Sequence, residues 1–92
     1  MKPLPVDAAR LRREFPALDD GDVAAYEAVT RRILGRAAPA DRARVTREVL
    51  ARGREAAGRA AKGDPLSEDD ALALRYLRAV GKMQPGAERR RP

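Results

Sequence analysis

Apolar residues cover most of the circumference of one predicted helix, residues 68–83, and this feature most limits the folds open to the chain. At about 100° per residue, its apolar positions span an arc of roughly 220°. They are Leu72, Ala73, Leu74, Tyr76, Leu77, Ala79, Val80, Gly81 and Met83. A helix on the surface of a bundle needs a narrower apolar stripe. We therefore expect this helix to contact neighbours on two sides, either at the centre of a bundle or in a dimer interface.

Asp7 and Asp19 mark two helix starts near the N-terminus. An aspartate placed just before a helix can accept a hydrogen bond from a backbone N–H of the first turn. Pro16 ends the first helix, because the residue before a proline is pushed out of the α-helical region. The second helix is predicted over residues 20–34, and Gly35 supplies its stop signal.

A third helix is predicted from Pro39, which suits the first turn of a helix, to Lys62, before Gly63. Large apolar side chains occur only in its first half. In the second half we interpret Gly53 as a site of close approach by a neighbouring helix. For Gly58 the sequence leaves two readings open, close packing or a weakly held helix end.

Ser67 and Asp70 form the pattern of a capping box at the start of the last helix. No segment shows the alternation of apolar and polar residues that a strand requires. The predicted fold class is therefore all-α, a small bundle of three principal helices plus a short N-terminal helix. We expect one helical domain over residues 6–84, a mobile lead-in over 1–5 and a disordered basic tail over 85–92.

The inventory of reactive side chains argues against catalysis. The chain has no His, no Cys and a single serine, Ser67, which we assign to helix capping. Acidic clusters at 19–22 and 68–70 coincide with helix starts, where the helix dipole favours negative charge. We therefore expect no enzyme, no cofactor, no metal site and no small-molecule substrate. The absence of a long apolar run predicts no membrane span and a cytoplasmic location.

The predicted core is thin, and this makes self-association a candidate property. Hydrophobic residues are 43% of the chain, but nineteen of them are alanine and only three residues are aromatic. A dimer can pool two such cores. Candidate protein-interface residues lie on the last helix, although core packing is the commoner role for each. They are Leu72, Leu74, Tyr76, Leu77 and Met83.

Positive charge is concentrated in the centre of the chain. The net charge is +6, and residues 31–62 alone hold ten Lys and Arg residues against three acids. Within the third predicted helix, Glu48 and Glu55 each precede an arginine by four positions, which predicts the ion pairs Glu48–Arg52 and Glu55–Arg59. The remaining bases are the candidate nucleic-acid contacts. They are Arg44, Arg47, Arg54, Lys62, Arg89, Arg90 and Arg91.

This basic surface has three interpretations: an ordinary solvated helix face, a nucleic-acid contact or a site for an acidic protein. Both tyrosines fall on apolar helix faces, so no exposed aromatic is available for base stacking. The excess of Ala and Arg is typical of a GC-rich bacterial genome. The sequence therefore favours a small non-enzymatic bacterial helical interaction module, with a protein partner or self-association ahead of nucleic acid. The alternative is weak, largely non-specific nucleic-acid binding through the arginine-rich third helix and the tail.

Overall fold

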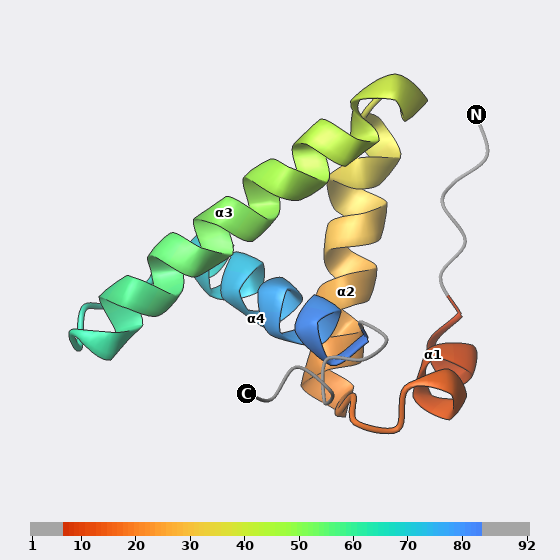
Figure 1. Cartoon of the computed structure of the whole chain (residues 1–92), viewed down its shortest axis with the longest axis horizontal. Helices are drawn as coiled ribbons and strands as arrows, with labels where there is room; N and C mark the ends of the chain where they lie inside the picture. Colours follow the sequence, from red (N-terminus) through yellow and green to blue (C-terminus); the bar gives the residue numbers. More distant parts are fainter. Residues whose placement is uncertain (1–6, 84–92) are drawn as a thin grey trace, which may run out of the picture.

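The computed structural model describes residues 7–83, and all regular structure within that range is helical (Figure 1). Its elements are α1 (Ala8–Glu14), α2 (Asp20–Arg32), the short 3-10 helices η1 (Leu34–Arg36) and η2 (Pro39–Asp41), α3 (Arg42–Ala61) and α4 (Glu68–Met83). The predicted all-α fold class is confirmed for this part of the chain. The predicted lead-in 1–5 and tail 85–92 lie outside the described residues. None of the helices in the described range is long and apolar enough to cross a bilayer.

α4 lies at the centre of the bundle and packs against both α2 and α3. These two helices diverge from the turn that joins them, and α4 lies across the space between them (Figure 1). Its buried apolar residues are Ala73, Leu74, Tyr76 and Ala79. At helical spacing these positions are spread around more than half of the helix. The broad apolar arc of the sequence therefore corresponds to packing on two sides within a single chain.

A core cluster forms where α1 and α2 meet the C-terminal half of α4. Leu18, Val23 and Ala79 are its buried members. Five partly buried side chains pack against it: Ala8, Leu11, Phe15, Tyr26 and Met83. Burying a side chain such as Leu18 or Val23 contributes about 1.5–3 kcal/mol. Because α1 is short and has no buried residue of its own, it depends on this cluster for its position.

Tyr26 of α2 stacks on Tyr76 of α4. Their ring centroids are 5.8 Å apart and their planes are inclined by 20°. Tyr76 is 3% exposed, and burial raises the pKa of its hydroxyl above the ordinary value. Stacked aromatic pairs of this kind contribute about 0.5–1.5 kcal/mol beyond the area that they bury. The pair therefore stabilises the packing of α2 on α4 near the middle of both helices.

α1 and α2 start at the capping residues that the sequence predicts. Asp7 accepts a hydrogen bond from the backbone N–H of Arg10 at 3.2 Å. At the start of α2 the Asp22 N–H donates to Asp19 Oδ1 at 2.8 Å, and the Asp19 N–H donates to Asp22 Oδ2 at 3.1 Å. These bonds form a reciprocal capping box.

The boundaries between α2 and α3 differ from the prediction. α2 ends at Arg32 rather than at residue 34, and the chain continues as the 3-10 helix η1. Pro39 opens another 3-10 helix, so that α3 begins only at Arg42. The C-cap residue Ile33 is 37% exposed. Ile33 still donates its N–H to the Val29 carbonyl at 3.0 Å, so the chain leaves the α-helix directly after this residue.

α3 ends where the sequence predicts. Gly63 has a φ of +80°, the left-handed conformation that glycine adopts without steric cost. The Gly63 N–H donates to the Ala60 carbonyl at 3.0 Å, and the Asp64 N–H donates to the Arg59 carbonyl at 3.0 Å. These bonds satisfy carbonyls that the helix end would otherwise leave unpaired.

Gly53 lies where α3 crosses α4. A Cβ atom at this position would lie 2.6 Å from the Ala73 carbonyl oxygen and 3.0 Å from the Leu77 Cβ. Both distances are shorter than van der Waals contact, so any larger residue would push the helices apart. The predicted close approach at Gly53 is therefore confirmed. At Gly58 the corresponding space is empty to 4 Å, which decides against close packing there.

Candidate functional site

The arginines of α3 point in two different directions. Arg52 and Arg59 face α4, where both contact the carboxylate of Asp70. Arg52 Nε lies 2.7 Å from Asp70 Oδ1, and Arg59 Nη1 lies 3.0 Å from Asp70 Oδ2. The predicted Glu48–Arg52 and Glu55–Arg59 ion pairs are therefore wrong. The spacing rule behind them considers one helix only, whereas the preferred partner comes from another.

Asp70 is 8% exposed, although it carries a charge. Its backbone N–H donates to Ser67 Oγ at 3.2 Å, as the capping pattern predicts. Its carboxylate points to the two arginines instead of returning to the backbone of Ser67, so the box is only half formed. The hydrogen bond from Arg52 holds the pKa of the Asp70 carboxyl below its ordinary value, against the opposing effect of burial.

Asp22, at the start of α2, likewise forms an ion pair with a residue of another helix. Like Asp70, it is the third residue of its helix, and its Oδ2 atom lies 2.5 Å from Nζ of Lys82 near the end of α4. Burial acts to raise the pKa of the Asp22 carboxyl, but the bonds from Lys82 and Asp19 bring it below the ordinary value. Both acidic clusters thus supply a side chain that joins two helices.

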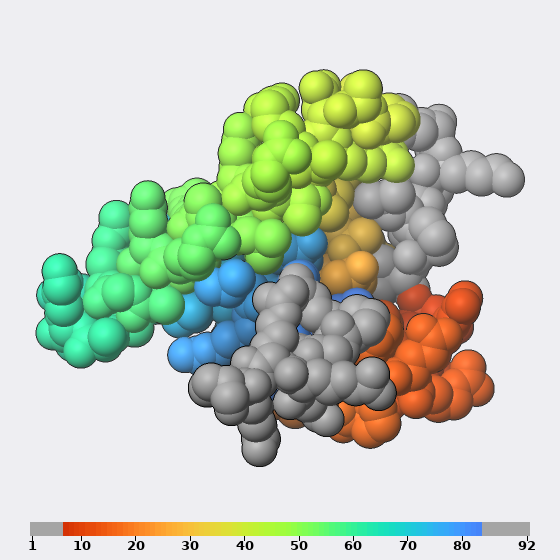
Figure 2. Space-filling model, in the orientation of Figure 1, coloured from red at the N-terminus to blue at the C-terminus, as the bar shows by residue number. Residues whose placement is uncertain are grey.

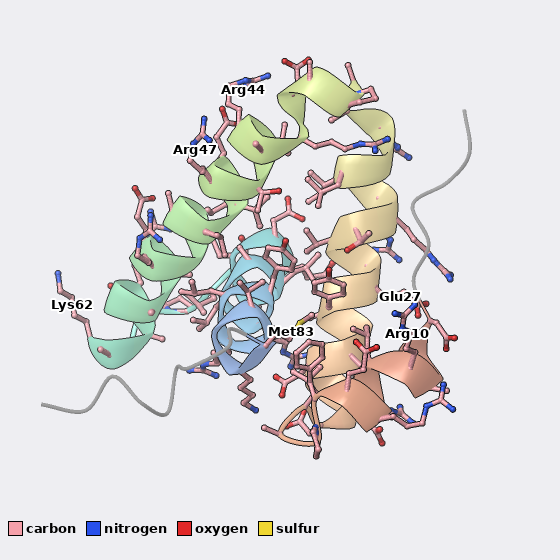
Figure 3. All side chains as sticks on the ribbon, turned by 45° about the vertical axis from the view of Figure 1, so that its right-hand side comes forward. Arg10, Glu27, Arg44, Arg47, Lys62 and Met83 are labelled. Atoms are coloured by element: carbon pink, nitrogen blue, oxygen red, sulfur yellow. The ribbon has the colours of Figure 1, made fainter. Side chains whose placement is uncertain are left out.

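The outer side of α3 carries the remaining bases. Figure 2 shows α3 as a ridge along one edge of the molecule, and Arg44, Arg47 and Lys62 extend from it away from the other helices (Figure 3). Arg44 pairs with Glu48 at 2.8 Å. Within residues 7–83, the side chains of Arg47, Arg54 and Lys62 have no hydrogen-bond or ion-pair partner. The structure therefore leaves three unpaired bases on this face.

Three of the predicted nucleic-acid contacts, Arg89, Arg90 and Arg91, lie outside the described residues. The predicted surface on α3 is also smaller than the sequence indicates, because Arg44 is already paired.

The predicted interface residues divide into two groups. Leu74 and Tyr76 are 7% and 3% exposed within the single chain, so their side chains serve the core. Leu77 packs where α3 crosses, and Met83 packs against the core cluster beside α1. Leu72 is only half-buried and lines a hollow at the surface.

This hollow lies between α2 and α4 and has a volume of about 350 Å³. It is lined by Gly21, Ala24, Ala25, Glu68, Ala71, Leu72 and Arg75, and we call it the α2–α4 hollow. The α2 wall consists entirely of small residues, whereas α4 supplies one large apolar side chain and two charges. A second hollow of about 530 Å³, lined by Gly21 and five charged residues, adjoins it and shares Gly21 and Arg75.

The sequence interpretation missed the α2 wall of this hollow. Gly21, Ala24 and Ala25 lie at positions i, i+3 and i+4, which share one side of a helix. That spacing could have indicated the wall of the hollow. A run of small residues indicates a site of close packing, however, only when a neighbouring helix is known to lie beside it.

Comparison with known proteins identified no matching family model, no similar curated protein and no similar solved structure. The function therefore has to be inferred from the geometry of the chain itself.

Proposed function

We propose that the protein is a non-enzymatic interaction module that binds a helical protein segment at the α2–α4 hollow. The observation that supports this most is the half-buried Leu72 beside a wall of small residues. A helix can approach closely over glycine and alanine, and the apolar side chain then loses its remaining contact with water. The charges of Glu68 and Arg75 on the rim can orient the bound segment.

A non-enzymatic role is proposed from the chemistry that the residues offer. The sequence contains neither His nor Cys, the groups most often used for proton transfer and nucleophilic attack near neutral pH. The most buried acids, Asp22 and Asp70, are engaged in ion pairs between helices. Both therefore have a structural role that accounts for their position.

Nucleic-acid binding is the second candidate, supported by the unpaired bases on the outer face of α3. Arg47 and Arg54 are seven residues apart, about 10.5 Å along the helix. Three unpaired bases can neutralise few phosphates, and non-specific affinity depends on that number. Because Arg52 and Arg59 face Asp70, the α3 surface offers less support for this role than the hollow offers for protein binding.

Capture by the full-length chain tests the proposal with two matched variants. Ala24→Arg places a long charged side chain in the wall of the hollow, and Ala43→Arg places the same side chain on the outside of α3. Both alanines are exposed on helices, so neither change should disturb the core. The wild-type chain and each variant are immobilised separately and incubated with a lysate of the encoding organism together with an untagged copy of the chain.

We expect a protein that is retained by the wild type and by Ala43→Arg but lost with Ala24→Arg. Identical sets of retained proteins for the two variants would contradict binding at the hollow.

A further inference from the structure

We infer that the occupant of the α2–α4 hollow is a second copy of this chain, bound about a two-fold axis that passes beside Ala71 and Leu72. This inference rests on the proposed function, because it names the partner of the same hollow. It depends on two features of the hollow, the placement of its charges and the shape of its walls.

Two opposite charges, Glu68 and Arg75, line the hollow from α4. Glu68 and Arg75 are seven residues apart, which is about two helical turns, so both project from the same side of α4. The midpoint between them falls between Ala71 and Leu72. Within residues 7–83, neither Glu68 nor Arg75 has a hydrogen-bond or ion-pair partner for its side chain. The single chain therefore presents a positive and a negative charge that form no ion pair, although Arg75 also lines the second hollow with Asp19, Asp20 and Asp22.

An antiparallel copy of α4 pairs these charges. When two identical helices run in opposite directions about the midpoint of Ala71 and Leu72, Glu68 of each copy lies opposite Arg75 of the other. A two-fold interface repeats every contact, so this pairing occurs twice. A parallel arrangement in register would instead place like charges opposite each other, which is unfavourable. The charge pattern is therefore complementary to itself in one orientation only.

The walls of the hollow have shapes that fit the same orientation. The α2 wall of Gly21, Ala24 and Ala25 leaves room beside α4 for an added side chain. Leu72 is the one large apolar side chain in the lining, and Leu72 of the second copy is placed to enter this room. The walls are thus complementary to each other across the axis, as an isologous contact requires.

The core of the single chain also favours association. Four of the ten buried apolar residues within the described range are alanine. Small domains with few large buried side chains commonly gain stability by oligomerising. Burial of Leu72 from both copies would extend the apolar interior across the axis.

Sedimentation velocity of the full-length chain, from low micromolar to near-millimolar concentration, tests the inference. We expect a monomer–dimer equilibrium in the wild type. Arg75→Glu and Glu68→Arg should each weaken dimerisation about tenfold or more, because each places like charges opposite one another twice. The double variant Glu68→Arg/Arg75→Glu should restore the wild-type dissociation constant within a few-fold, since the pairs are then reversed but intact.

Two controls keep the outcome clear. Arg54→Glu reverses an exposed charge on α3 and should leave the dissociation constant unchanged. If Glu68→Arg fails to fold, as judged by helical circular dichroism, then Ala24→Arg replaces it, with Ala43→Arg as its match. Ala24→Arg should give a monomer, and Ala43→Arg should give the wild-type equilibrium.

A wild-type chain that stays monomeric over the whole range would overturn the inference. So would a dimer that Arg75→Glu and Ala24→Arg leave intact, or a double charge reversal that fails to restore it. If the chain is monomeric but still retains a different protein, and Ala24→Arg abolishes that retention, only the inference of self-association is refuted. Loss of all Ala24-dependent capture would remove the proposed function as well.

Discussion

The Oδ1 atom of Asp70 lies 2.7 Å from Nε of Arg52, and this contact joins the first turn of α4 to the middle of α3. Asp22 makes the equivalent contact with Lys82, between the start of α2 and the end of α4. Each aspartate is the third residue of its helix, where the dipole favours a negative charge. One side chain therefore helps to start a helix and also fixes the position of a neighbouring helix.

Removing the charge of Asp70 should loosen the contact between α3 and α4. Asp70→Asn keeps the size of the side chain but leaves Arg52 and Arg59 without an anionic partner. We expect the melting temperature to fall on the order of 5 °C, measured by circular dichroism. Asp64→Asn, at an exposed position after α3, should leave it unchanged. Equal melting temperatures for the two variants would show that the Asp70 contacts add no stability.

Stability should fall in acid because of the same aspartates. The pKa of both Asp22 and Asp70 lies below the ordinary value in the folded chain. Such carboxyls stabilise the protein above the pKa of the unfolded state, and this contribution is lost as the pH falls through the folded-state pKa. We expect the melting temperature to decrease between about pH 5 and pH 2. The double variant Asp22→Asn/Asp70→Asn should show a flatter profile, and an unchanged profile would contradict the assignment.

Two glycines of α3 should respond oppositely to the same substitution. Gly53→Ala forces a Cβ against the Ala73 carbonyl and should lower the free energy of unfolding by about 1–3 kcal/mol. Gly58→Ala meets open space and should raise it by up to about 1 kcal/mol, because alanine favours the helix. Urea denaturation measures both. A gain in stability for Gly53→Ala would show that α3 and α4 do not need to approach so closely.

Thr30 should be replaceable by valine with a gain in stability. Its Oγ1 atom is buried and has no hydrogen-bond partner within the described residues. Valine has nearly the same shape without the hydroxyl, so Thr30→Val should raise the free energy of unfolding by about 1 kcal/mol. Thr46→Val is the matched control, because the Thr46 hydroxyl already donates to the Arg42 carbonyl at 2.8 Å. That control should give no gain, and equal effects of the two changes in urea denaturation would contradict the prediction.

Nucleic-acid binding should not depend on the outer face of α3. We expect wild type and Arg47→Ala/Arg54→Ala to bind mixed-sequence duplex and single-stranded probes with the same low affinity and the same salt dependence. Fluorescence anisotropy over a salt series measures both quantities. A reduction of about 2 in the slope of log affinity against log salt would instead show that both arginines contact phosphates.

The starts of α1, α2 and α4 could be predicted because caps depend on neighbours within one turn. Asp7 and Asp19 accept the predicted local bonds, and Gly63 takes the predicted left-handed conformation. The sequence also predicted that α4 contacts neighbours on two sides, since a broad apolar arc requires them.

Contacts between helices could not be predicted in the same way. Arg52 and Arg59 have acids at the favourable spacing within α3, yet both bind Asp70, eighteen and eleven residues away along the chain. The α2–α4 hollow was missed for a related reason. Its walls come from segments about fifty residues apart in the sequence, and no local rule indicates that Ala24 and Leu72 line the same space.

The central position of α4 also bears on synthesis at the ribosome. α2 and α3 are translated first, and each packs mainly on a helix that does not yet exist. At roughly 5–20 residues per second, the stretch from the end of α3 to the end of α4 takes about one to four seconds to translate. Until α4 is available, the faces of α2 and α3 that pack on it cannot be buried. Native packing of α2 and α3 therefore has to wait for α4.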